Sequence, residues 1–296
     1  MSSPAHSTPH IARLSDRTVI RLTGADRVRF LQGLVTADIA ALGPNDAAWS
    51  ACLTPQGRWQ TDFFVLAHPD DPCLLLDCAT TQAEALRTQL LRFRLRSDVA
   101  IDLTGLSVHA VWEAATDSVA GETLLENALS YRDPRLDNAG WRLIDAPPTT
   151  TANATEQDYA LHRLALGLPD GVQDCEAGRT LAAEANMDLL GGISWGKGCY
   201  MGQEVTARMR YRGLVKRRLV PVAATAPLPA PGTPIEQNGV EVGTLRSSQD
   251  HLALAMLKTG LPPAPLLCAG HTLTPRPPAW LAEALQPPAS SNSAPD

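Results

Sequence analysis

The chain has 296 residues, of which 44% are hydrophobic and 19% are charged, and its formal net charge is −6. These values are typical of a packed globular protein with two or three domains, because one core rarely organises so long a chain. They argue against a protein whose whole surface binds nucleic acid, and the longest apolar runs are far too short to span a bilayer.

The six cysteines form no C-x-x-C pair, which indicates reduced thiols rather than a disulfide framework or a structural zinc site. The first ten residues lack the apolar core of a signal peptide. We therefore expect a cytoplasmic protein without a bound metal.

The first half of the chain is expected to be mixed α+β. A hairpin is predicted from two strands, at 47–53 and 58–66, that flank the turn Thr54-Pro55-Gln56-Gly57. An amphipathic helix is predicted to begin near Thr81, with Thr81 and Glu84 as a capping box. The apolar run at 73–78 predicts a strand buried on both faces. Further strands are predicted at 18–22, 99–103, 106–112 and 141–145, and a brief helix at 28–32.

The second half begins with a helix predicted at 156–166, where Thr155 and Asp158 give the start signal and Gly167 the end. Glu184 then stands among alanines and leucines. An acid in so apolar a stretch either pairs with a cation in the core or hydrogen-bonds a ligand. Short strands around the proline-rich stretch at 226–234 predict a small C-terminal β-barrel.

The most distinctive stretch is Lys197-Gly198-Cys199-Tyr200-Met201-Gly202-Gln203-Glu204. Its glycines allow a tight turn, and a short helix is predicted from Gln203 onward. Cys199 would precede the helix N-terminus with Lys197 beside it, a setting that favours thiolate over thiol. Residue chemistry leaves two interpretations open: a reactive thiol, or a small buried residue in a tight loop, which composition alone favours.

Positive charge is concentrated directly after this stretch. Residues 197–218 contain seven cations and one acid, so this segment carries +6 and the remainder carries −12. Such a local field suits capture of a carboxylate-bearing cofactor, a phosphate or an RNA backbone. An equally weighted alternative is a solvated face whose arginines pair with nearby acids.

The motif at 197–208, continuing through Tyr211-Arg212-Gly213 to Lys216-Arg217, resembles the signature of the YgfZ family, which includes the mitochondrial Iba57 proteins. The segments at 23–38, 54–58, 163–169 and 243–247 resemble the same family, so the resemblance spans about residues 11–260. This family is related in fold to the T-protein of the glycine cleavage system, an aminomethyltransferase.

The resemblance implies a GcvT/YgfZ-like α+β fold, with mixed antiparallel sheets and helices in two interleaved N-terminal domains and a small C-terminal β-barrel around a folate pocket. The expected organisation is a flexible leader at 1–10, a folate-binding region at 11–222, a proline-rich linker at 223–234, the barrel at 235–283 and a disordered tail at 284–296.

The function implied by the resemblance is binding of tetrahydrofolate, or another reduced folate, in support of iron–sulfur cluster assembly or repair in client enzymes, including enzymes that thiolate tRNA. Assembly proteins or clients are the expected partners, and no membrane is. Relatives often have proline where this chain has Ala182, two residues before Glu184. The resemblance assigns chemistry to Cys199 and Lys197 and folate binding to Glu184, Tyr200, Gln203 and Arg208.

Two alternatives stay open. One is a folate-dependent one-carbon transferase like the T-protein, against which the cysteine motif argues because the T-protein is not expected to carry it. The other is a non-catalytic module that uses the basic segment on RNA or a protein, with direct nucleic-acid binding less favoured. The sequence does not choose between cluster chemistry, persulfide chemistry or neither for Cys199.

Overall fold

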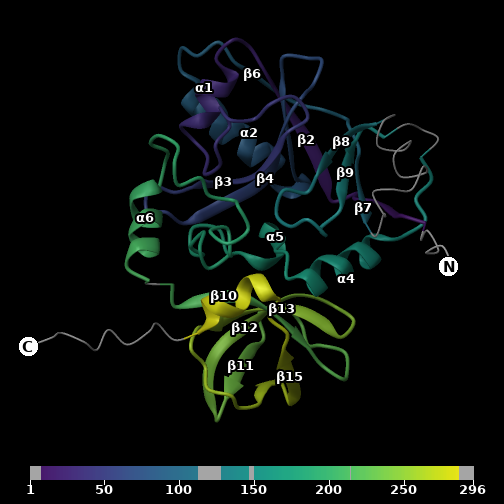
Figure 1. Cartoon of the computed structure of the whole chain (residues 1–296), viewed down its shortest axis with the longest axis vertical. Coiled ribbons are helices and arrows are strands. Elements are labelled where there is room, and N and C mark those ends of the chain that lie inside the picture. Colours follow the sequence, from purple (N-terminus) through teal and green to yellow (C-terminus); the bar gives the residue numbers. More distant parts are fainter. Residues whose placement is uncertain (1–7, 113–127, 147–149, 214, 287–296) are drawn as a thin grey trace, which may run out of the picture.

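The protein is described by a computed structural model over residues 8–112, 128–146, 150–213 and 215–286. Most of the expected leader and tail lies outside these residues. The two sheets lie at one end of the molecule, the barrel lies at the other, and some of the helices lie between them (Figure 1).

The first sheet has five antiparallel strands in the order β3-β4-β5-β2-β6. One face is covered by two helices, whose Phe30, Leu86 and Leu90 pack into a core with strand residues such as Phe63. All six residues of β5 are buried, which confirms the strand expected to be covered on both faces. The elements are β2 (Arg17–Thr23), α1 (Arg27–Gln32), β3 (Ala47–Leu53), β4 (Trp59–Ala67), β5 (Leu74–Ala79), α2 (Thr80–Arg94) and β6 (Ala100–Leu103).

The second sheet has the order β1-β7-β9-β8, and it takes the first strand of the chain, so the two sheet domains interleave as expected. A second core joins the inner faces of both sheets to α4, with Trp49, Phe64, Tyr131 and Tyr159 among its members. The elements are β1 (His10–Arg13), β7 (Val108–Trp112), β8 (Leu129–Arg132), β9 (Trp141–Ile144), α4 (Glu156–Leu166) and α5 (Gly171–Asp174).

Of the two predicted capping boxes, the structure contains one. At α4, the Thr155 side chain accepts from the Asp158 N–H and the Asp158 carboxylate accepts from the Thr155 N–H, so the expected capping box is confirmed. At α2 the expected box is wrong, because the helix already begins at Thr80 and its N-cap residue, Ala79, has no capping side chain.

The barrel closes in the order β10-β13-β12-β11-β14-β15. It begins at β10, upstream of the expected boundary at 235, because β10 pairs with both β13 and β15 to complete the closure. The proline-rich stretch is therefore a connection between two barrel strands. The elements are β10 (Arg217–Ala223), β11 (Pro234–Gln237), β12 (Val240–Gln249), β13 (Leu252–Lys258), β14 (Leu266–Cys268), β15 (His271–Pro275), α7 (Ala279–Ala282) and η1 (Glu283–Leu285).

The remaining helix, α6 (Gln203–Tyr211), lies at the outer edge of the molecule between the sheets and the barrel (Figure 1). It begins where the sequence predicted a helix. Within the described residues, no helix is long and apolar enough to cross a membrane.

Candidate functional site

Two glycines seat the cysteine loop on the β3–β4 hairpin turn. Gly57 and Gly202 both have positive φ angles, 70° and 83°. A Cβ atom on Gly202 would lie 2.6 Å from the Thr54 carbonyl oxygen, and one on Gly57 would lie 3.0 Å from the Val205 Cβ. Only glycine fits both the conformation and the close approach.

Cys199 is exposed, whereas the other five cysteines are buried. The interpretation of Cys199 as a packing residue is therefore wrong. Burial raises the pKa of Cys52 and of Cys78 to about 12, so these thiols are poor sources of thiolate at neutral pH. Cys199 is the thiol that a partner or reagent reaches from solvent.

Lys197 anchors the loop from the inside. Its buried ammonium donates to the carbonyl oxygens of Val35, at 2.8 Å, and Ala37. It also lies 5.2 Å from the centre of the Tyr200 ring. Burial lowers the pKa of Lys197 to about 8. The ammonium is engaged with backbone carbonyls, so the structure gives Lys197 a positioning role for the loop that carries Cys199.

Glu184 is buried and paired. Its Oε1 accepts from Arg217 Nε at 3.0 Å, and its Oε2 accepts from the Leu181 N–H at 2.9 Å. In the same region the Arg218 guanidinium donates two hydrogen bonds to Asp188, both at 2.9 Å. The sequence left two interpretations of Glu184, pairing with a cation or hydrogen-bonding a ligand. The structure shows the pairing, and its cation is Arg217.

The other predicted folate residues are spread around the cysteine loop. Tyr200 is buried beneath it, Gln203 opens α6, and Arg208 pairs on the surface with Glu204 at 3.0 Å. Their assignment to folate, like that of Glu184, is untested, and it competes with a ligand site in the central pocket described next. The structure groups them on the loop, on α6 and on the turn beside β10, and none of the predicted residues lines the central pocket described next.

The central pocket lies where both sheets, α4 and the barrel strand β12 meet, and its volume is about 190 Å³. Phe64 and Tyr159 give it aromatic walls, and Ser248 and Gln249 close it from the barrel. Acidic and basic groups balance along the lining, with Asp16, Asp62, Glu156 and Asp170 facing Arg17, Arg135, Arg142 and Arg163.

Three guanidinium groups surround the ring of Phe64. Those of Arg142, Arg135 and Arg17 lie 4.2, 4.9 and 5.7 Å from the ring centre. Such cation–π contacts gain strength where water is excluded. These three guanidinium groups place three positive charges in the lining of the pocket, around Phe64.

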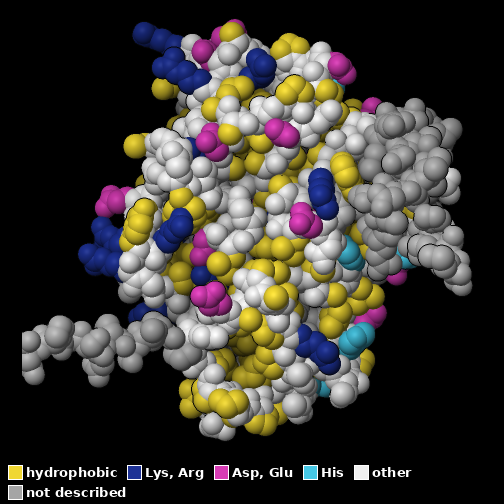
Figure 2. All heavy atoms as spheres, in the orientation of Figure 1, with side chains coloured by type: hydrophobic (Ala, Val, Ile, Leu, Met, Phe, Trp, Pro, Cys, Tyr) yellow, Lys and Arg dark blue, Asp and Glu magenta, His cyan; other side chains and the backbone are white. Residues whose placement is uncertain are grey.

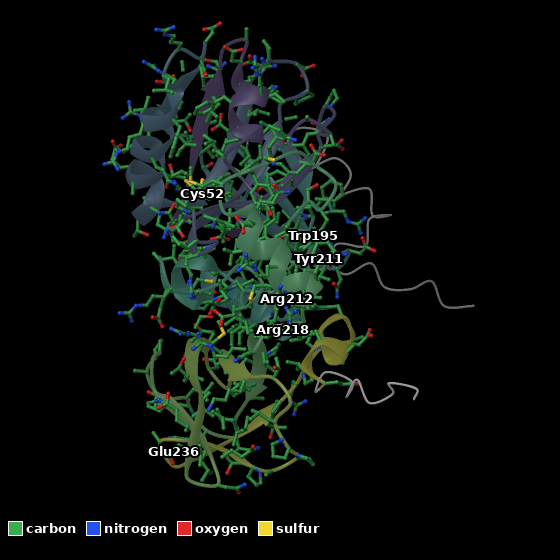
Figure 3. The ribbon with its side chains drawn as sticks, turned by 90° about the vertical axis from the view of Figure 1, so that its left-hand side faces the viewer. Cys52, Trp195, Tyr211, Arg212, Arg218 and Glu236 are labelled. Carbon is green, nitrogen blue, oxygen red and sulfur yellow. The ribbon has the colours of Figure 1, made fainter. Side chains whose placement is uncertain are left out.

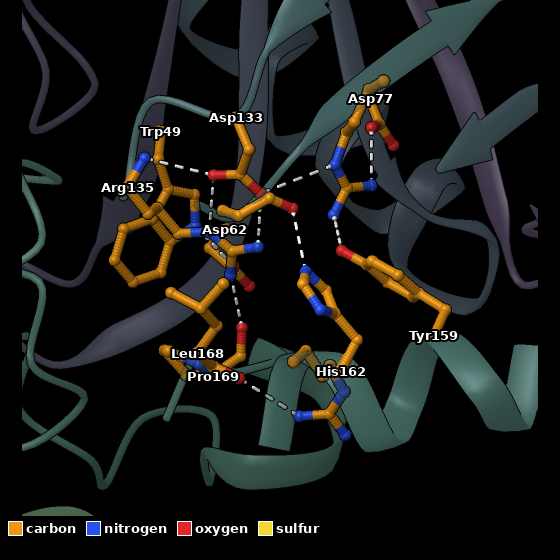
Figure 4. A network of polar contacts seen from close by, with 12 residues as sticks. Trp49, Asp62, Asp77, Asp133, Arg135, Tyr159, His162, Leu168 and Pro169 are labelled. Carbon is orange, nitrogen blue, oxygen red and sulfur yellow. Dashed lines mark hydrogen bonds and ion pairs between the residues drawn. The ribbon is translucent and has the colours of Figure 1, made fainter. Parts of the chain in front are cut away.

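Two buried carboxylates compensate for most of this charge, as Figure 4 shows in part. Asp77 accepts from Arg17 Nε at 2.7 Å and from Arg142 Nη1 at 3.1 Å. Asp133 forms a bidentate pair with Arg135, at 2.9 and 2.7 Å. Burial alone would raise the pKa of Asp133, but Arg135 lowers it below its ordinary value. Asp133 therefore stays ionised.

Asp62 is a buried acid that makes no ion pair with any described residue. Its Oδ2 accepts from Trp49 Nε1 at 2.9 Å (Figure 4). No residue in the described part of the chain donates a hydrogen bond to its Oδ1. Burial raises the pKa of Asp62. A carboxyl group that lines a pocket and has an oxygen without a donor among the described residues is a group that a ligand can satisfy. Sequence reasoning missed it, although an acid directly before Phe63-Phe64-Val65-Leu66 in a strand was a signal.

The barrel is fixed to this pocket through Asp174, which is fully buried. Its carboxylate accepts from the Ser247 N–H at 3.0 Å and the Ser247 hydroxyl at 2.6 Å, both in β12. It also accepts from the Asp170 N–H at 2.7 Å and from Arg163 Nη1 at 3.2 Å. Because Ser248 follows directly in β12, Asp174 holds the barrel's part of the pocket wall in place.

Comparison with known proteins places the chain in a family. Residues 216–283 match the family described as CAF17, C-terminal beta-barrel domain. The chain is 32% identical over 282 residues to the Mus musculus protein named iron-sulfur cluster assembly factor IBA57, mitochondrial, covering 86% of this chain and 79% of that protein. The Homo sapiens protein of the same name is 34% identical over 271 residues, covering 83% and 76%. The chain belongs to the IBA57 family. The sequence resemblance pointed to the broader YgfZ family, and these two relatives identify the IBA57 proteins within it.

The fold of this IBA57-family chain resembles that of the glycine cleavage system aminomethyltransferase T from Bartonella henselae, with a TM-score of 0.70 over 95% of this chain and 88% of that one. At 13% sequence identity the likeness shows the fold alone. The GcvT-like fold with mixed antiparallel sheets and a C-terminal barrel is confirmed.

The expected cytoplasmic location is wrong. Curated relatives of this IBA57-family chain, from mammals and fungi, are named mitochondrial, which points to the mitochondrion instead.

Proposed function

We propose that this IBA57-family chain supports iron–sulfur cluster assembly and binds a reduced folate in its central pocket. The assembly role is supported by the names of relatives that match most of the chain. It is also supported by Cys199, the exposed thiol on a loop that glycines and Lys197 hold in one position. Enzymes that thiolate tRNA are among the clients that the family resemblance implies.

The ligand proposal is carried by Asp62 and its free Oδ1. The ring system of tetrahydrofolate is uncharged, its pyrimidine part is flat, and it bears N–H donors, from which a carboxyl oxygen that lines the pocket accepts well. Phe64 and Tyr159 supply the aromatic walls for such a ring, and Gln157 and Gln249 supply amide groups at its edges. The balanced charge of the lining also suits an uncharged polar ring.

The size of the pocket limits how a folate would bind. Its volume of about 190 Å³ is below the roughly 300 Å³ of sites that enclose a drug-sized ligand. The pocket would therefore enclose the ring system and leave the aminobenzoyl-glutamate tail at its mouth. This arrangement makes the ring, rather than the tail, the part that Asp62 recognises.

Complementation tests the assembly role in cells that lack their own IBA57-type factor. The wild-type chain should restore the activity of iron–sulfur enzymes, and Cys199→Ala should not. Cys268→Ala is the matched control, because this cysteine is buried in the barrel core far along the chain from the loop. No rescue by wild type would contradict the assembly role, and full rescue by Cys199→Ala would show that the thiol has only a structural role.

A further inference from the structure

Aromatic and basic side chains gather on the outer surface of α6 and the loops beside it. We define the α6 face as Trp195, Arg210, Tyr211, Arg212 and Lys216. The Tyr211 side chain is 81% exposed, and the Arg210 guanidinium lies 4.3 Å from the centre of the Trp195 ring. Figure 3 shows Trp195, Tyr211 and Arg212 close together on the side facing the viewer.

The α6 face is positively charged although its neighbours are neutralised. Arg208, Arg217 and Arg218 each pair with an acid. Within the described part of the chain, Arg210, Arg212 and Lys216 have no acidic partner within salt-bridge distance. Figure 2 shows Lys and Arg side chains along the edge where α6 lies. The basic segment at 197–218 thus contains arginines that pair with acids and a small surface of unpaired cations. The remainder of the chain is acidic.

The chemistry of the α6 face distinguishes between two classes of partner. A protein interface needs an apolar core, yet Tyr211 is the one large hydrophobic side chain that α6 exposes. Single-stranded nucleic acid instead needs rings on which bases stack and cations along the backbone. The ring of Tyr211, the stacked pair of Arg210 and Trp195, and the two further cations match that need.

We propose that the α6 face binds a short single-stranded nucleic acid. This activity goes beyond the proposed function and uses a surface separate from the central pocket, so each can fail without the other. The acidic remainder of the chain repels phosphates beyond the face. The binding site is therefore short, toward the lower end of the roughly 4–16 nucleotides typical of such sites.

Fluorescence anisotropy with labelled oligouridine and oligothymidine of about eight nucleotides tests the proposal. We expect binding at about 50 mM salt that weakens steeply by about 200 mM. Tyr211→Ala and Arg212→Glu should each weaken binding about tenfold. Binding of either strand supports the proposal, and tighter binding of the RNA would show a contribution from its 2′-hydroxyls.

The matched control is a second exposed surface, at the end of α2, where Phe93 is 39% exposed and arginines flank it. Arg94→Glu changes the net charge as much as Arg212→Glu does. If both reversals weaken binding equally, the attraction is non-specific and the α6 face is not the site. Absence of binding at low salt would also overturn the proposal. The altered residues are exposed, and matching thermal melts confirm that each variant is folded.

Discussion

Gly171 lies directly against Asp62, which lines the central pocket. A Cβ atom on residue 171 would lie 1.8 Å from Asp62 Oδ1 and 2.4 Å from the Trp59 ring. Gly171 opens α5, so the start of this helix rests directly on the strand β4 that carries Asp62. The absence of a side chain at position 171 therefore sets where the free carboxyl oxygen lies.

Gly171→Ala should destabilise the protein and displace Asp62. The added methyl group overlaps buried atoms, and overpacking of this kind costs about 1–3 kcal/mol. Urea unfolding measures the change. Gly105→Ala is the control, because no atom lies within 4 Å of a Cβ there, and we expect it to stay within about 0.5 kcal/mol of wild type. Equal stability of the two variants would show that the contact carries no strain.

Asp62→Asn should make the protein more stable at neutral pH while weakening ligand binding. Burial raises the folded-state pKa of Asp62 above its ordinary value of 3.8. The folded protein thus holds this proton more tightly than the unfolded chain, and stability falls as pH rises from the ordinary value through the folded one. Asparagine removes this loss. Thermal melts from about pH 4 to 7 measure it, and an unchanged profile would contradict the assignment.

Asp174→Asn should loosen the barrel from the rest of the pocket. The change leaves the buried Arg163 without its anion, and breaking a buried pair in this way costs about 3–5 kcal/mol. Hydrogen exchange should rise first in β12 around Ser247. Glu204→Gln, which breaks the exposed pair with Arg208, should cost less than about 1 kcal/mol. Unchanged exchange in β12 would show that other contacts hold the barrel.

Thiol titration of the native protein should label one cysteine rapidly. Cys199 is exposed and the other five are buried, so a thiol-specific reagent reaches only Cys199 without unfolding. Cys199→Ser should abolish the fast phase and leave the total in denaturant reduced by one. A second fast thiol in the wild type would contradict the burial of the remaining cysteines.

Local signals in the sequence predicted local structure well. The limits of α4 followed from the Thr155 box and from Gly167, which takes the left-handed conformation with φ of 77°. The hairpin around Gly57 followed from its turn residues in the same way. The place of β10 in the barrel could not be predicted from local signals. Its partners β13 and β15 come about 30 or more residues later, and only closure of the barrel brings them together.

The candidate site could be predicted only in part for the same reason. The motif around Cys199 stood out because it is continuous. The charge count of residues 197–218 overstated the unpaired positive charge of this segment. Arg217 pairs with Glu184, and Arg218 pairs with Asp188, each about 30 residues away in the chain. The central pocket gathers Arg17, Asp62 and Arg142 from three separate strands, so no spacing along the chain revealed it.

Calorimetric titration with tetrahydrofolate tests the central claim most directly. The wild-type chain should bind, and Asp62→Asn should bind about tenfold more weakly, because it loses a charged acceptor for the ring N–H groups. Glu184→Gln should bind like wild type, since Glu184 pairs with Arg217 outside the pocket. No heat from the wild type at millimolar ligand would contradict the claim. So would binding that survives Asp62→Asn and is lost in Glu184→Gln.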